Sequence, residues 1–177
     1  MKRFLSIISI SAVILMIMFS MSFAGPLDAR PEINKKKSFL SCPNPGIADL
    51  SAQLVRKTGN GKGRIKLIAT VNNNSSSAFE SKPGQQSVFF SILFKSGLAK
   101  SLISKDFQNL APGQQIQLTH EMDWSNFHDD IDWPTAFKAA ILYDPDIRAD
   151  GNPKNDDCNV NNNEKTLPVD TVDALVR

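Results

Sequence analysis

The stretch Leu110–Trp124, LAPGQQIQLTHEMDW, decides the expected fold. A Pro-Gly turn at Pro112 and Gly113 opens it, and side chains then alternate between an apolar and a polar face. This period of two is typical of a strand with one buried and one solvated face. The residues expected on the buried face are Ile116, Leu118, His120, Met122 and Trp124. Such a strand needs a second sheet over its apolar face, so the sequence predicts two packed sheets.

Other segments have the same period or are apolar throughout, and turn residues separate them. Residues 87–95 are apolar on both faces, which favours a central strand, whereas residues 98–107 fit either an edge strand or a short helix. No segment has a convincing helical period, and the last residues are expected to fray. The other expected strands are residues 48–55, with Ala48, Leu50, Ala52 and Leu54 inward; 64–72, with Ile65, Leu67, Ala69 and Val71 inward; 135–144, with Phe137, Ala139, Ile141 and Tyr143 inward; and 164–169, an edge. We therefore expect an all-β fold, an antiparallel β-sandwich of about seven strands.

The N-terminal residues have the composition of a secretory signal peptide. Lys2 and Arg3 precede an apolar run, and small residues, Ser22 and Ala24, stand at positions −3 and −1 before Gly25. We expect residues 1–24 to be removed on export, the alternative being an uncleaved membrane anchor. Residues 25–46 would then form a flexible arm, 47–170 the sandwich and 171–177 a C-terminal tail, in a secreted or periplasmic protein.

Charge argues against a nucleic-acid partner. Of the 20 Lys and Arg, Lys2 and Arg3 lie in the expected signal peptide, so the remaining 18 equal the 18 Asp and Glu. A formally neutral chain lacks the positive field that attracts phosphates. Basic residues concentrate in 35–105 and acidic residues in 121–157, which predicts a dipolar surface, or a mixed one if strands from both regions interleave.

The chain has two cysteines, Cys42 and Cys158, and both follow the expected signal peptide. An even number of cysteines in an exported chain is the setting in which disulfides form, and two free thiols are the alternative. Two cysteines without a neighbouring histidine provide too few ligands for zinc.

The acidic segment 144–157 is a candidate calcium site. Its carboxylates and amides are spaced by a few residues, and Gly151 permits a sharp turn, as an ion with six to eight oxygen ligands requires. The same residue types also satisfy their own backbone in ordinary loops, which is the alternative interpretation. The candidate ligands are Asp144, Asp146, Asp150, Asn152, Asp156 and Asp157.

Two weaker candidates lie around residues 120–133. Histidine with carboxylates can bind a transition metal, although His120 on the apolar face is more readily a core residue. Aromatic rings beside carboxylates can hold sugars or cations, although the tryptophans also suit the core and the end of a sandwich. The metal candidates are His120, His128, Asp129, Asp130 and Asp132, and the binding candidates are Trp124, Phe127 and Trp133.

Catalysis has little support in the sequence. It contains no nucleophile elbow, phosphate-binding loop or dinucleotide fingerprint, so we do not expect an enzyme.

Asn73 and Asn74 each begin an N-x-S sequon, which has meaning only in a host that glycosylates.

Three fragments together resemble a bacterial family. They are Ala48-Asp49-Leu50 at the start of the first strand, Leu110-Ala111-Pro112-Gly113 before the fifth, and Tyr143-Asp144-Pro145-Asp146 leading to Asn161-Asn162-Asn163. In this order the chain is similar to the CARDB family, the cell-adhesion-related domain found in bacteria, over residues 47–169. The segments 125–134 and 144–163 are longer than that pattern, and the cysteine pair is not part of it.

The resemblance implies an immunoglobulin or fibronectin-III-like sandwich and a role in adhesion. It also implies that the start of the first strand and the loop before the last lie at one end, which would bring Cys42 near Cys158. We therefore expect an exported, non-catalytic module that engages a protein or carbohydrate partner through end loops or an exposed strand. The alternative is a calcium-stabilised structural module that uses the Asp144–Asp157 loop.

Overall fold

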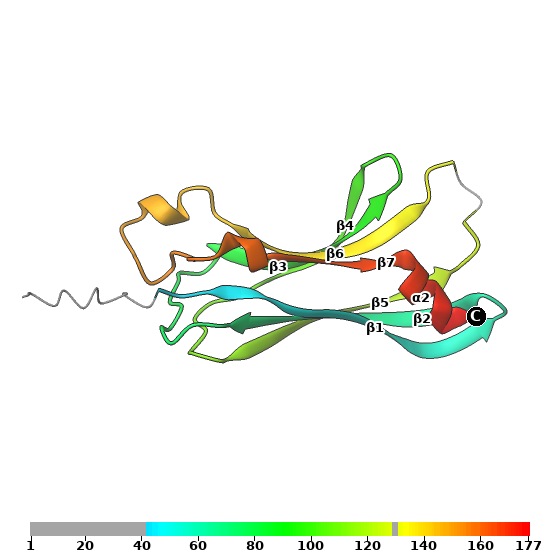
Figure 1. The fold of residues 1–177 in the computed structure, drawn as a ribbon, viewed down its shortest axis with the longest axis horizontal. Coiled ribbons are helices and arrows are strands. Elements are labelled where there is room, and N and C mark those ends of the chain that lie inside the picture. The colour runs from blue at the N-terminus through cyan, green and yellow to red at the C-terminus, as the bar shows by residue number, and fades with distance from the viewer. Residues whose placement is uncertain (1–41, 129–130) are drawn as a thin grey trace, which may run out of the picture. The chain divides into compact units, whose positions relative to one another are not determined.

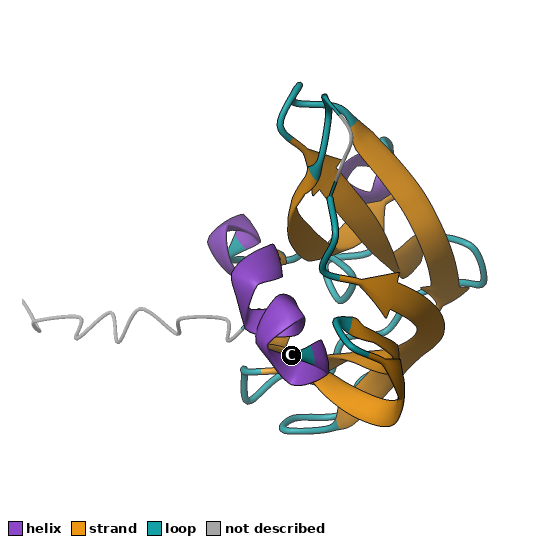
Figure 2. Ribbon diagram, turned by 90° about the vertical axis from the view of Figure 1, so that its right-hand side faces the viewer, coloured by secondary structure: helices purple, strands orange, loops and turns teal. Residues whose placement is uncertain are grey.

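The computed structural model describes residues 42–128 and 131–177, which form a two-sheet antiparallel β-sandwich consistent with an immunoglobulin-like fold (Figures 1 and 2). The expected signal peptide, residues 1–24, and residues 25–41 of the expected arm lie outside the described residues. Within the described residues, the elements in chain order are β1 (Pro45–Gly59), β2 (Lys62–Asn73), β3 (Gln86–Phe94), β4 (Ala99–Asp106), β5 (Gln115–Ser125), β6 (Pro134–Tyr143), the 3-10 turns η1 (Ile147–Ala149) and η2 (Val160–Asn162), β7 (Glu164–Pro168) and the helix α2 (Val169–Val176).

One sheet has the order β1-β2-β5 and the other the order β4-β3-β6-β7. The predicted alternation is confirmed in β2, where Ile65, Leu67, Ala69 and Val71 are all fully buried. The same alternation holds in β6, where Phe137, Ala139 and Ile141 are buried. The period of two therefore places one apolar row of each sheet against the other, and these rows form the core.

The predicted positions of the strands within the sheets are also confirmed. The doubly apolar β3 is central, with β4 on one side and β6 on the other. Residues 99–106 form the edge strand β4, not a helix, and β7 pairs only with β6 at the opposite edge.

Strand β5 follows the predicted alternation at the edge of its sheet. Leu118 and Trp124 are buried, whereas Ile116, His120 and Met122 are only partly buried. The difference from β2 arises because β5 has a neighbouring strand on one side only.

The prediction for β1 is wrong at Ala48, which is exposed. The pairing of β1 with β2 shifts register between Ile47 and Asp49, so that Ile47 and Leu50 are both buried. A β-bulge of this kind inserts one residue and reverses which side chains point inward. Leu54 lies opposite the buried Ile65 but remains 39% exposed at the sheet edge.

The expectation of a frayed C-terminus is also wrong, because residues 169–176 form the helix α2. Val169, Val172 and Val176 lie three and four residues apart, on one face, and all three are buried. The helix packs at the end of the sandwich that carries the β1–β2 turn (Figure 1).

The two ends of the sandwich differ. We call the end with residues 74–85, 107–114 and 144–163 the disulfide end, because Cys42 and Cys158 are joined there with a Cα–Cα distance of 6.0 Å. We call the other end, with the β1–β2 turn, the β3–β4 turn, the β5–β6 loop and α2, the hairpin end. None of the helices in the described residues is long and apolar enough to cross a membrane.

Candidate functional site

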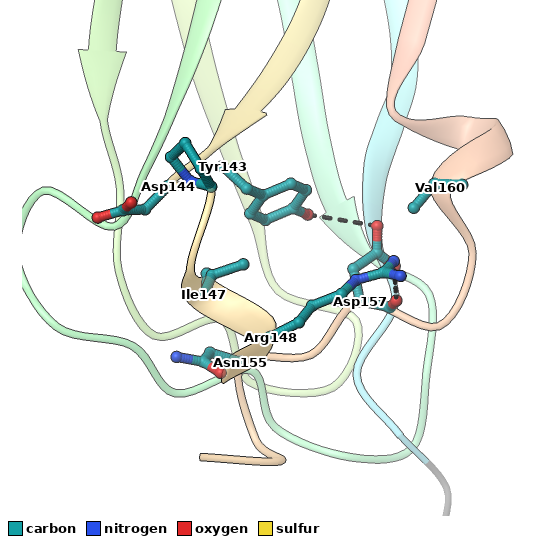
Figure 3. Close-up of a pocket in the computed structure, with 8 residues that line it drawn as sticks. Tyr143, Asp144, Ile147, Arg148, Asn155, Asp157 and Val160 are labelled. Carbon is teal, nitrogen blue, oxygen red and sulfur yellow. Dashed lines mark hydrogen bonds between the residues drawn. The ribbon is translucent and has the colours of Figure 1, made fainter. Parts of the chain in front are cut away.

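A pocket of about 270 Å³ opens at the disulfide end, in the long loop between β6 and β7 (Figure 3). Polar, charged and apolar groups share its wall, which is the usual composition of a small ligand site. The lining residues are Tyr143, Asp144, Pro145, Ile147, Arg148, Asn155, Asp157 and Val160.

The loop keeps its shape because several of its residues are anchored. Ile147 on η1 is buried under the loop, and Asn155 is completely buried. Cys158 is bonded to Cys42, and its backbone N–H also donates to the carbonyl of Pro43 at 3.1 Å. The disulfide therefore fixes the far side of the pocket to the start of β1.

Asp157 is a structural anchor within the pocket. Its carboxylate accepts hydrogen bonds from the Tyr143 hydroxyl at 3.4 Å, the Asn163 side-chain amide at 2.6 Å and the Asn159 backbone N–H at 2.9 Å. Burial, followed by the negative charge of Asp157, raises the pKa of Tyr143 well above its ordinary range. Tyr143 therefore remains a neutral phenol.

Arg148 is the cation of the pocket. One of its terminal nitrogens donates to the backbone carbonyl of Asp157 at 3.3 Å, and Figure 3 shows both Arg148 and Tyr143 pointing toward Asp157. Within residues 42–128 and 131–177, no carboxylate oxygen lies within 4.0 Å of its guanidinium nitrogens. Because a guanidinium carries five N–H donors, Arg148 retains donors for a ligand.

Acceptors and apolar surface complete the wall. Asp144 is exposed and contributes a carboxylate, while Ile147 and the half-exposed Val160 contribute apolar surface. Donors and acceptors beside an aromatic ring can bind a hydroxyl-rich group or a polar side chain of another protein.

The structure does not gather the six predicted calcium ligands into one cluster. Asp150 accepts hydrogen bonds from the side chains of Gln85 and Asn155 and from the backbone N–H of Asn152, each at 2.8 Å. Asn152 in turn donates to the backbone carbonyl of Glu80. These contacts are the turn chemistry that was the alternative to metal binding.

The remaining candidate ligands lie in separate places. Asp144 and Asp146 are adjacent, and the pKa of Asp146 is raised by a hydrogen bond with Asp144 and by that residue's negative charge. Asp156 is half-buried, and Asp157 anchors Tyr143. In the described part of the chain, no three His, Cys, Asp or Glu residues form a group that could hold a metal ion. Calcium binding stays a prediction.

The predicted histidine site is also divided. His120 lies on the inward face of β5, opposite Leu67, while His128 contacts Asp173 of α2 at 3.3 Å. Asp132 accepts hydrogen bonds from the hydroxyl and backbone N–H of Ser96, and these bonds lower its pKa. Asp129 and Asp130 lie outside the described residues.

The three predicted aromatic residues do not share one surface. Trp124 is buried against Phe137, with ring centroids 5.1 Å apart, and its indole N–H donates to Asp173. Phe127 is 58% exposed, and Trp133 is partly covered by the ammonium group of Lys95, 3.9 Å from its ring centroid. Trp124 is thus a core residue, and only Phe127 and Trp133 are available to a partner.

The structure distinguishes the two sequon asparagines. Asn73 is completely buried, and its side chain donates to the carbonyls of Ser77 and Leu110, whereas Asn74 is exposed. A glycan on Asn73 is incompatible with this fold.

Sequence reasoning missed Arg148, Asn155 and Val160 as pocket residues. No motif marks them, since each is an ordinary loop residue until the loop folds. Tyr143 was expected as an inward residue of a strand and as part of a fragment that resembles the CARDB family, but not as a pocket residue. No protein-family model matches the chain, and a search of curated proteins found no significant match.

Proposed function

We propose that the protein is an exported, non-catalytic binding module that engages a carbohydrate or protein partner. The observation that carries this proposal is the pocket at the disulfide end, where Arg148 has no carboxylate partner among the described residues and so offers hydrogen-bond donors. A rigid sandwich that presents one loop pocket is suited to recognition, because the binding groups are held in place before the ligand arrives.

The Cys42–Cys158 bond supports export. Disulfides persist in oxidising compartments and are rare where thiols are kept reduced. Together with the signal peptide expected in residues 1–24, the bond favours a secreted or periplasmic location.

The resemblance to CARDB domains supports an adhesive role. The Ala48–Leu50 fragment lies in β1, the Leu110–Gly113 fragment is the turn before β5, and Tyr143 ends β6 where the long loop begins. The three fragments thus lie in a strand, a turn and a loop, which is compatible with the resemblance.

The pocket suits one sugar ring or one polar side chain better than a large ligand. Its volume of about 270 Å³ lies below the range of sites for drug-sized molecules. Vicinal hydroxyl groups can pair with a guanidinium and a carboxylate at the same time, which favours a carbohydrate.

The proposal is tested by binding of the fluorescently labelled chain to arrays of glycans and extracellular proteins. We expect saturable binding to at least one class, which unlabelled protein competes away. Arg148→Ala should weaken this binding by about tenfold, as expected for loss of a central charged contact. Lys154→Ala is the matched control, because Lys154 is an exposed cation of the same loop that bonds Glu80 outside the pocket.

Two results would contradict the proposal. One is that the protein binds no class of glycan or protein on the arrays in a saturable way. The other is equal binding by the Arg148→Ala variant and the wild type, which would remove the pocket as the recognition site.

A further inference from the structure

We propose that the Cys42–Cys158 disulfide is a redox switch for the pocket, and that its reduction by a dithiol releases one wall of the pocket while the sandwich stays folded. This inference deepens the proposed function, because it names how the same site is regulated, and it rests on that function for its effect on binding. We call residues 156–162 the switch segment. It contains Cys158 and two residues of the pocket wall, Asp157 and Val160.

The other wall of the pocket is held without the disulfide. The backbone N–H of Asp144 donates to the carbonyl of Gln85 at 2.8 Å. Further along the loop, the backbone N–H of Glu80 donates to the carbonyl of Lys154 at 2.9 Å, and the side chains of the same two residues form an ion pair. Residues 144–155, which include the arginine of the pocket, therefore keep their place whatever the state of the cysteines.

The switch segment is held to the start of β1. Besides the disulfide, the backbone N–H of Cys158 donates to the carbonyl of Pro43 at 3.1 Å, and the Asn162 side-chain amide donates to the Asn44 side chain at 2.9 Å. Asn44 is itself fixed, because its backbone N–H and its carbonyl both bond residues at the end of β2. Since the chain has two cysteines, the disulfide is the only covalent crosslink between this fixed point and the switch segment.

Across the pocket, the switch segment makes long hydrogen bonds. The Tyr143 hydroxyl lies 3.4 Å from the Asp157 carboxylate, and a guanidinium nitrogen of Arg148 lies 3.3 Å from the Asp157 carbonyl (Figure 3). Both distances exceed the usual range of about 2.5–3.2 Å, so these bonds are weak. The shorter bond from Asn163 to Asp157, 2.6 Å, lies beside the start of β7 and leaves the segment attached there. Opening the crosslink therefore loosens the segment without detaching it.

The disulfide is open to a reductant at one of its two sulfurs. Cys158 is exposed, whereas Cys42 is half-buried. A thiolate of the dithiol attacks Sγ of Cys158, the S–S bond breaks, and Cys42 leaves as a thiolate that takes a proton from water. The second thiol then attacks the reductant's own sulfur and releases Cys158, so the protein gains two electrons and two protons while the dithiol becomes a disulfide. Exposed disulfides belong to the labile and regulatory class.

The test uses the full exported chain in its oxidised form, after treatment with a dithiol, and as the double variant Cys42→Ser with Cys158→Ser. Both cysteines should become open to alkylation after dithiol treatment of the folded chain. Amides of Asn159 and Asn162 should exchange with solvent at least about tenfold faster in the reduced chain and in the double variant. Amides of Glu80 and Asn155 are the internal control on the other wall and should change by less than about twofold.

The chain also carries its own optical reporters at its two ends. Tyr143 is its single tyrosine and lines the pocket, whereas both tryptophans, Trp124 and Trp133, lie at the hairpin end. Burial, followed by the charge of Asp157, raises the pKa of Tyr143. Tyrosinate absorbance should therefore appear at a lower pH in the double variant than in the oxidised chain. Tryptophan emission should be the same in both, because the sandwich stays folded.

The effect on binding is measured on the same arrays of glycans and extracellular proteins. The oxidised chain should bind at least about tenfold more tightly than the double variant, because a pocket that is closed only a tenth of the time has a tenfold weaker apparent affinity. Reoxidation of the reduced wild type should restore binding. If nothing on the arrays binds, the proposed function fails, and amide exchange and tyrosine absorbance still decide whether the disulfide holds the pocket wall.

Four results would overturn the proposal. The first is a disulfide that the dithiol does not reduce in the folded chain. The second is unchanged amide exchange of the switch segment in the double variant. The third is a shift of tryptophan emission together with tyrosine ionisation, which would mean that reduction unfolds the whole sandwich. The fourth is equal binding by the oxidised chain and the double variant.

Discussion

At the scale of single residues, Asn73 connects several segments of the fold. Its amide donates to the carbonyls of Ser77 and Leu110, and its side-chain oxygen accepts the backbone N–H groups of Asn44 and Ser75. These bonds join the start of β1, the end of β2 and the turn before β5 at the disulfide end.

We predict that Asn73→Ala destabilises the fold by about 2–4 kcal/mol, because several buried donors and acceptors lose their partner at once. Asn74→Ala, at the exposed neighbouring position, should change the free energy of unfolding by about 0.5 kcal/mol or less. Denaturant unfolding of both variants measures the difference. Equal stability of the two would contradict the role assigned to Asn73.

Tyr143 makes stability sensitive to alkaline pH. Its pKa is raised above the ordinary value of 10.0, chiefly by burial and then by Asp157. A raised pKa means that the stability from the neutral phenol is complete below about pH 10 and is lost as the pH rises above it. We therefore predict that the free energy of unfolding falls more steeply above about pH 10 in the wild type than in Tyr143→Phe. Parallel pH profiles from chemical denaturation would show that Tyr143 is not the cause.

At the scale of elements, α2 is the least expected feature. Its sequence, VDTVDALV, has valines at positions 169, 172 and 176, but eight residues are too few to separate a helical period from chance. The packing partners decide the conformation, since Trp124 donates to Asp173 and Val172 is completely buried.

We predict that Val172→Ala destabilises the fold by about 1–3 kcal/mol through lost burial and an unfilled cavity. Thr171→Ala, one residue away and exposed, should cost about 0.5 kcal/mol or less. Thermal unfolding of the two variants makes the comparison. Equal melting temperatures would mean that α2 adds no stability to the sandwich.

The strands were predictable to different degrees, for physical reasons. In β2 and β5 unbroken alternation specified the inward face, because the period of a strand maps directly onto its two sides. In β1 a bulge near Ala48 reversed the pattern, and nothing in the local sequence marks the extra residue. Alternation therefore predicts a face only as far as the register is regular.

At the scale of the whole molecule, the fold was more predictable than the site. Apolar periodicity is a local property, and it predicted the two sheets. The pocket depends on how the β6–β7 loop folds over Ile147 and on the bond between Cys42 and Cys158. Carboxylates of this loop that suggested calcium, such as Asp150, bind amide groups in the fold, because a loop must satisfy its own backbone first.

The two charged regions of the sequence meet in the folded chain. Arg64 of β2 lies 3.2 Å from Glu121 and 3.5 Å from Asp123 of β5, and Lys154 lies 2.9 Å from Glu80. Antiparallel pairing of β2 with β5 brings Arg64 to its two carboxylates, and the Lys154–Glu80 pair joins two loops. These ion pairs fit the mixed alternative, not the dipolar one.

The central claim is that the protein is an exported sandwich whose binding loop is closed by an oxidised cysteine pair. The most direct test is the intact mass of the exported protein after thiol alkylation, with and without prior reduction. We predict a chain beginning at Gly25, with no alkylation before reduction and two alkylated cysteines, Cys42 and Cys158, after it. Alkylation of both cysteines without reduction would contradict the claim.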